Sequence, residues 1–337
     1  MDAVFGVESP AFVAVRAVLS ICTIGLLGAL SLRWAVLGRY AGPDAELLRA
    51  AVDERLRPWI DRLALVAVAA TLARFVAQHA AVFGSEQALT RDALATLLFR
   101  SNWGRAWWLA ITSAIVVTWV APRLRRSTNT AWLVAAAAIL LLAASQPLSG
   151  HPAAATMPRL AVAMQLLHLV GAGGWVGSLA LLTFVAIPAA RDLERDVSRD
   201  QRREPSREPS REPGREASHT ATGDPDARIA GLIRAFSPTA LAFSALLGIT
   251  GLFTAWGNLG GFAPLWQSEY GRTLLIKLGF LSITAATGAY NWRRVLPTLG
   301  DSTSSARLRR SSLVELSASL LVLIATAVLV ATPMPGE

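Results

Sequence analysis

The sequence has little charge and none of the common motifs of soluble enzymes. Only 16% of its 337 residues are charged, whereas soluble domains carry about 25%. Cys22 is the single cysteine, which excludes an intramolecular disulfide, a CxxC pair and a thiolate cluster. The chain contains no GxxxxGK[ST] loop, no HExxH helix and no GxSxG elbow. It therefore shows no machinery for ATP-driven pumping or for hydrolysis, and we expect no enzymatic activity.

Apolar residues, by contrast, make up 53% of the chain and gather into separate runs. A bilayer core requires about 20 apolar residues per helix, and the runs are close to that length. They predict an all-α, polytopic membrane helix bundle of about eight transmembrane helices. The predicted helices cover residues 11–37, 58–83, 103–120, 130–148, 158–187, 234–256, 271–292 and 312–332.

The net charge of +9 comes from arginines in the connections between these runs. Their placement argues against a nucleic-acid surface, which would need one soluble basic face. The connections after the first, third, fifth and seventh runs are the arginine-rich ones, so the positive-inside rule places them in the cytoplasm and both chain termini in the periplasm. The connection between the second and third runs also contains arginines, and residues 93–99 within it are predicted to form a short interfacial helix.

Residues 191–228 form a charged, proline-bearing segment that includes the repeat REPSREPSREPGRE. Such a composition buries too little apolar surface to offset the entropy of ordering. We predict a disordered cytoplasmic linker here. It separates helices 1–5, in residues 1–190, from helices 6–8, in residues 229–337, within one membrane domain.

Polar side chains inside a membrane are candidates for function because they are costly to bury there. Met164, His168 and Trp175 share one face of the fifth predicted helix together with Gly171, and Met157 lies one further step outward. Imidazole binds copper well, and thioether sulfur selects Cu(I) over harder ions. A methionine at helical spacing is more often a packing residue, so a purely structural reading stays open.

The other candidates are also placed in the outward halves of the predicted helices. His79 and His151 are predicted to join His168, Met157 and Met164 as metal ligands. Lys277 is the only lysine in the chain; it either lines a pathway or extends its amine to the membrane surface. The residues predicted to line the pathway or to support the ligands are Trp175, Gln165, Lys277 and Tyr270.

Several segments resemble one known family. These are SGHPAA from Ser149, LLHLVGAGGWVGSLALL from Leu166, FSPTAL from Phe236, YGRTLLIKLGF from Tyr270 and NWRRVLP from Asn291, with NWGRAW from Asn102 before them. Their order and spacing resemble the copper resistance protein D family (CopD/PcoD). WVGS at Trp175 stands where that family commonly has WxGG. The resemblance places His151 and His168 at motif positions.

The resemblance implies a bacterial inner-membrane protein that moves copper toward the cytoplasm, with Cu(I) preferred to Cu(II), and that contributes to copper resistance. It also implies a separate periplasmic copper carrier, because no soluble carrier domain is attached here. The expected partners are thus copper, that carrier and the lipid bilayer, and no nucleic acid. Two alternatives stay open: a membrane haem protein for electron transfer with histidine axial ligands, and a copper sensor or scaffold that does not transport.

Overall fold

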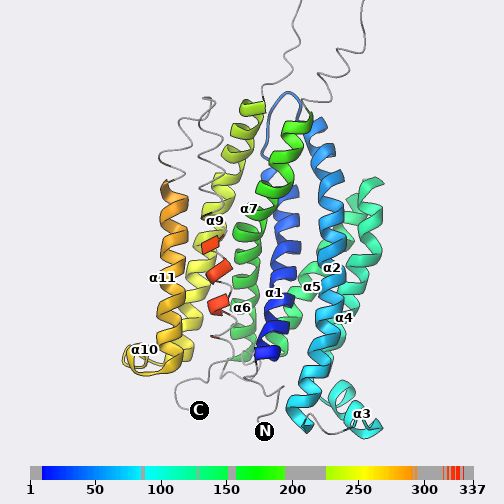
Figure 1. Ribbon diagram of the computed structural model, residues 1–337, viewed down its shortest axis with the longest axis vertical. Helices are drawn as coiled ribbons and strands as arrows, with labels where there is room; N and C mark the ends of the chain where they lie inside the picture. Colours follow the sequence, from blue (N-terminus) through cyan, green and yellow to red (C-terminus); the bar gives the residue numbers. More distant parts are fainter. Residues whose placement is uncertain are drawn as a thin grey trace, which may run out of the picture.

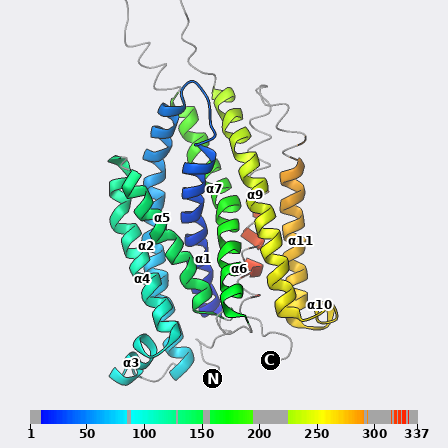
Figure 2. The same ribbon diagram turned by 180° about the vertical axis from the view of Figure 1, so that it is seen from behind.

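The computed structural model is a bundle of long helices. It describes residues 10–84, 88–126, 129–150, 157–193, 225–290 and 293, and further scattered positions from 314 to 329. Every regular element in these residues is helical. Most helices run along one common direction (Figures 1 and 2).

The first half of the bundle is built around α1. α1 spans Pro10–Leu30 and continues as the π-helical η1, Ser31–Val36. α1 packs against α2, Ala45–Phe83, which in turn packs against α4, Asn102–Val120. A 3-10 turn, η2 (Ala121–Arg126), leads from α4 to α5, Asn129–Leu148. The short helix predicted at 93–99 is present as α3, Arg91–Phe99, which is capped by Thr90; its place at a membrane surface stays a prediction.

The second half begins with a helix that is π-helical in two places. Its parts are α6 (Pro158–Ala172), η4 (Gly173–Gly177), α7 (Ser178–Leu181) and η5 (Leu182–Ala186), and helix continues to Leu193. α9, Pro225–Leu259, packs against α6. The short α10, Pro264–Gln267, leads into α11, Glu269–Tyr290. Most of the eighth predicted helix, 312–332, lies outside the described residues.

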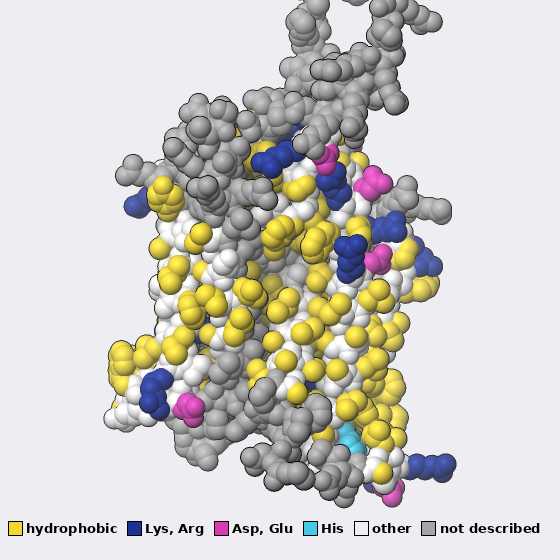
Figure 3. Space-filling view, viewed as in Figure 1, with side chains coloured by type: hydrophobic (Ala, Val, Ile, Leu, Met, Phe, Trp, Pro, Cys, Tyr) yellow, Lys and Arg dark blue, Asp and Glu magenta, His cyan; other side chains and the backbone are white. Residues whose placement is uncertain are grey.

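Five of the described helices are long and apolar enough to span a membrane by length and composition. They are Ala11–Val36, Asn102–Leu124, Asn129–Leu148, Pro158–Leu193 and Ala227–Leu259. α2 and α11 lie in the same bundle but are not among these five, so the prediction of eight spans stays a prediction. Figure 3 shows an apolar band across the middle of one face and charged side chains toward its two ends. That distribution suits a bilayer.

The two ends of the bundle differ in their connections. The loop between η1 and α2, the end of the long helix at Leu193 and the start of α9 lie at one end, here called the basic end (Figure 1). α1 begins at the other end, here called the outer end, where α2 and α5 finish and α6 begins. A hydrogen bond from Ser20 to Gln146, of 2.9 Å, joins α1 to α5 near that end.

The predicted linker, 191–228, overlaps helix at both boundaries: residues 191–193 continue the helix that ends at Leu193, and the overlap at the C-terminal boundary is longer. Residues 225–228 belong to α9, and Arg228 is buried, with its guanidinium paired to the carboxylate of Asp44. Tyr40 donates a hydrogen bond of 3.0 Å to the same carboxylate. Burial, helped by Asp44, raises the pKa of the Tyr40 phenol to about 12, so this donor keeps its proton at neutral pH. This ion pair orders a segment whose composition alone predicts disorder; residues 194–224 lie outside the description.

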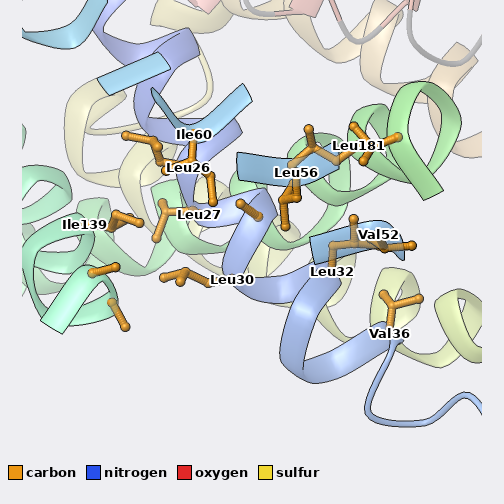
Figure 4. Packing of buried hydrophobic residues seen from close by; sticks show 14 of the residues in the cluster. Leu26, Leu27, Leu30, Leu32, Val36, Val52, Leu56, Ile60, Ile139 and Leu181 are labelled. Atoms are coloured by element: carbon orange, nitrogen blue, oxygen red, sulfur yellow. The ribbon is translucent and has the colours of Figure 1, made fainter. Parts of the chain in front are cut away.

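The apolar core lies between α1, α2, α5 and α7. One buried cluster contains Leu26, Leu27 and Leu30 of α1, Val52, Leu56 and Ile60 of α2, Ile139 of α5 and Leu181 of α7 (Figure 4). α1 also approaches η4 so closely that a Cβ added at Gly28 would lie 2.3 Å from the backbone carbon of Gly177. Only glycine fits at this contact.

We expect Gly28→Ala to lower the stability of the bundle, because the added methyl group meets backbone that cannot move aside. Overpacking of this kind costs about 1–3 kcal/mol. Gly248→Ala is the matched control, since Gly248 is also helical and a Cβ there meets nothing within 4 Å. Thermal unfolding in detergent should show a lower midpoint for Gly28→Ala alone. Equal midpoints for the two variants would contradict the close contact.

Asp44→Asn should be strongly destabilising because it leaves the buried Arg228 without its counter-charge. Breaking a buried pair costs about 3–5 kcal/mol. Asp61→Asn serves as the control, because Asp61 and Arg57 are 3.9 Å apart and partly exposed, and such pairs contribute about 0–1 kcal/mol. The same unfolding measurement compares the two. A loss at Asp44 no larger than that at Asp61 would show that the pair does not hold α9 to the rest of the bundle.

Candidate functional site

His168 lies where α6 packs closely against α9. Gly171 makes this approach possible, because a Cβ there would lie 3.2 Å from the backbone of Phe243 and of Leu247. Gly251 makes room for the imidazole itself: a Cβ at this position would be 3.2 Å from Cε1 of His168. Small residues on both helices therefore seat the histidine in the interface, in the manner of small-residue packing between membrane helices.

The contacts of His168 favour a proton on Nδ1. Its Nδ1 is 3.1 Å from Oγ1 of Thr250, and the ring also has a hydrogen bond to the backbone of Leu247. The Thr250 hydroxyl lies 2.7 Å from the carbonyl oxygen of Leu246 and 3.3 Å from that of Leu247, and when it donates to either carbonyl its oxygen is left to accept. Nδ1 of His168 is then the donor, and the neutral ring carries its lone pair on Nε2. This is the arrangement of a histidine that is oriented through one nitrogen and binds metal through the other.

Lys277 of α11 is close enough to His168 for its positive charge to act on the imidazole. His168, Thr250 and Lys277 also lie at matched depth. At about 1.5 Å per residue, their positions in α6, α9 and α11 put each roughly 12–15 Å from the outer end of its helix. The structure thus places an imidazole, a hydroxyl and an amine from three helices at one level of the bundle.

The remaining residues predicted for the fifth helix are arranged in order along it. Met164 and Gln165 are half-buried, one turn outward of His168. Met157, just before α6, is 62% exposed. Trp175 is buried within η4. A soft sulfur ligand at Met164 and an imidazole at His168 are therefore available on adjacent turns of one helix.

Tyr270 lies at the start of α11 and contacts the end of α9. It is buried at the start of α11, and its hydroxyl accepts a hydrogen bond of 2.7 Å from Nδ2 of Asn258 in α9. This bond ties the two ends of the α9–α11 connection together.

His79 lies in the other half of the bundle, near the end of α2. Its ring is buried, 5.2 Å from the ring of Phe83, and its Nε2 has no hydrogen-bond partner. None of the hydrogen bonds or ring contacts of the described residues joins His79 to His168. His151 lies outside the described residues. Within the described part of the chain, no three His, Cys, Asp or Glu side chains gather as a metal site.

Two residues of this region were missed in the sequence as functional candidates. Thr250 orients His168, although it appears in the sequence only as half of a Thr-Gly pair. Arg74 is buried in α2 and donates a hydrogen bond of 2.8 Å to Oγ of Ser149. The apolar run 58–83 contains two arginines, Arg62 and Arg74, and Thr250 is marked only by its place before Gly251.

The sequence of the whole chain was compared with protein families. Residues 7–159 match the model described as copper resistance protein D-like, N-terminal domain, and residues 230–329 match copper resistance protein D. The chain belongs to the copper resistance protein D family. It is a multi-pass membrane protein of copper resistance, and the haem alternative is not favoured by this membership. No match was found among curated proteins or solved structures.

In this CopD family member, the first match covers the first half of the bundle, and the second covers most of α9 and all of α11; most of α6, with His168, lies between the two matches. The α6 helix with His168 begins as the first match ends, and Thr250 and Lys277 lie in the second. The candidate site is formed where α9 packs against α6.

Thr250→Val should loosen His168 without changing the shape of α9. The substitution removes the acceptor for Nδ1, and an unpaired buried donor costs about 1–3 kcal/mol. Thr254→Val is the control, because the Thr254 hydroxyl bonds only to the carbonyl of Thr250, at 2.9 Å. ¹⁵N NMR of labelled histidine should show the Nδ1-protonated form in the parent chain and in Thr254→Val, and a mixture in Thr250→Val. The same tautomer in all three would contradict the assignment.

Proposed function

We propose that this protein carries copper across the bacterial inner membrane toward the cytoplasm, with Nε2 of His168 as a ligand within the bundle. The observation that carries the proposal is the Nδ1 bond to Thr250, which leaves the metal-binding nitrogen with its lone pair. Met164 offers a thioether one turn away on the same helix face, and sulfur with imidazole is a donor set that favours Cu(I). Copper is the transported substrate in this reading, not a resident cofactor.

Lys277 gives the site a repulsive element as well. Its charge acts at the position of His168, and a fixed positive charge weakens the binding of a cation. A transport site needs binding that is strong enough for entry and weak enough for release. We assign Lys277 the role of limiting how tightly copper is held at His168.

Capture would take place at the outer end of the bundle. Met157 is exposed there, and His151 follows Ser149 at the end of α5 in the sequence. His79 adds an imidazole whose Nε2 is unpartnered. From these ligands copper would pass to Met164 and His168. Inward movement of a cation down the membrane potential supplies about 2.3 kcal/mol per charge per 100 mV, so no nucleotide is needed.

The test is copper uptake by proteoliposomes under an imposed inside-negative potential, with metal content measured by mass spectrometry. We expect the parent chain to take up Cu(I) and to lose at least tenfold in rate on His168→Ala. His219→Ala is the matched control, a histidine in the sequence between the long helix that ends at Leu193 and α9. Uptake that His168→Ala leaves unchanged would overturn the site, and the absence of uptake by the parent chain would overturn transport.

The second arm of the experiment is Lys277→Gln, which removes the charge and leaves a polar side chain one atom shorter. Copper should be retained more tightly by the purified variant, and release into the vesicle should slow. Weaker retention would mean that Lys277 does not oppose copper at His168. Measuring retention and uptake together separates a ligand from a residue that only shapes the pathway.

A further inference from the structure

Two arginines, Arg16 and Arg74, lie toward the outer end of the bundle, and neither has an acidic partner among the described residues. Arg74 of α2 is 5% exposed. Arg16 of α1 is half-buried and close enough for its positive charge to act on Arg74. In the described part of the chain, neither guanidinium forms an ion pair with a carboxylate. The copper pathway proposed above uses neither residue.

The known contacts of Arg74 are all with neutral groups. Its Nη2 donates to Oγ of Ser149 at 2.8 Å, and its guanidinium lies over the ring of Trp103 at 5.9 Å from the centroid. Its Nε is buried and has no hydrogen-bond partner, and the same holds for Nε1 of Trp103. Two N–H donors from adjacent side chains are thus unused at one place.

The ring contact of Arg16 is also with a neutral group. Its guanidinium lies over the ring of Phe12, 5.7 Å from the centroid, and this contact also supplies no negative charge. Uncompensated burial of a charge costs several kcal/mol, and two like charges side by side add to that cost. In membrane proteins such groups are paired. The pair therefore needs an anion that the described residues do not provide.

We propose that Arg16 and Arg74, with Ser149 and Trp103 beside them, bind one phosphate-type oxyanion at the outer end of the bundle. The planar guanidinium fork matches the oxygens of phosphate, and unused N–H groups supply the hydrogen bonds. The oxyanion is either free inorganic phosphate or the headgroup phosphate of an anionic lipid, since the pair lies between helices near the membrane surface. Its negative charge also neutralises two fixed charges that would otherwise repel a copper cation arriving at this end.

The first experiment uses protein purified in detergent, stripped of phospholipid and exchanged into a chloride buffer. Added sodium phosphate should raise the unfolding midpoint of the parent chain by several degrees in a saturable manner. Arg74→Gln and Arg16→Gln should each weaken the apparent phosphate affinity at least tenfold. Arg272→Gln is the matched control, because Arg272 is an exposed arginine near the start of α11, and it should keep the full effect.

The second experiment distinguishes the two sources of the oxyanion. Native mass spectrometry of protein from nanodiscs of phosphatidylglycerol and of phosphatidylcholine should show one retained phosphatidylglycerol if the ligand is a lipid. Arg74→Gln should lose that lipid. A response to free phosphate with no retained lipid assigns the site to the free anion.

Arg74→Lys keeps the positive charge but loses the planar guanidinium fork. It replaces Arg74→Gln in the test if that variant does not fold. It should bind the oxyanion more weakly than the parent chain does. The proposal is overturned if phosphate does not change the unfolding midpoint of the parent chain and native mass spectrometry shows no selectively retained phosphatidylglycerol. The proposal is also overturned if the Arg16 and Arg74 variants respond to phosphate in the same way as Arg272→Gln. No copper enters these measurements, so their outcome is independent of the transport proposal.

Discussion

The close contact between α1 and η4 is the constraint on which the rest of the bundle depends. In a bilayer, lipid tails are as apolar as leucine, so helices associate through close packing rather than through a hydrophobic driving force. Gly28 and Gly177 bring two backbones together where no side chain fits. Because α1 also packs against α2 and α5, this one contact joins the first half of the chain to the long helix that carries His168.

The π-helical segment η4 of that long helix is part of the same close packing. η4 contains Gly173, Gly174 and Gly177, and each is in contact with a neighbouring element: the first and third with α1, the second with the ring of Phe243 in α9. The widened turn thus meets α1 on one side and α9 on the other. The interface that holds His168 against Thr250 lies directly outward of it, so the glycines set the geometry of the candidate site without entering it.

Charged side chains are paired at one end of the described bundle and lack carboxylate partners elsewhere in it. At the basic end, arginines are neutralised by Asp44, Asp53 and Asp192, which fasten loops and helices to one another. Further along the bundle, Lys277 stands beside an imidazole and Arg74 beside Arg16, without carboxylate partners among the described residues. Uncompensated charge is tolerated in a membrane only where it serves a ligand or a pathway. These two places are therefore where binding is expected, and they lie in different halves of the molecule.

The sequence alone determined the helical class, the membrane environment and the approximate limits of most helices, because apolar runs of bilayer length have few other stable structures. It also identified the face shared by His168 and Gly171, since helical periodicity is a local property. It extended the linker too far, because the order of residues 225–228 comes from a pair between Arg228 and Asp44, which are distant in sequence. Only the tertiary structure gave His168 its partner in Thr250, placed Lys277 at the same depth, and left Arg74 beside Arg16 without a counter-charge. Each of these depends on which helices become neighbours, and that is decided by packing across the whole bundle rather than by any local pattern.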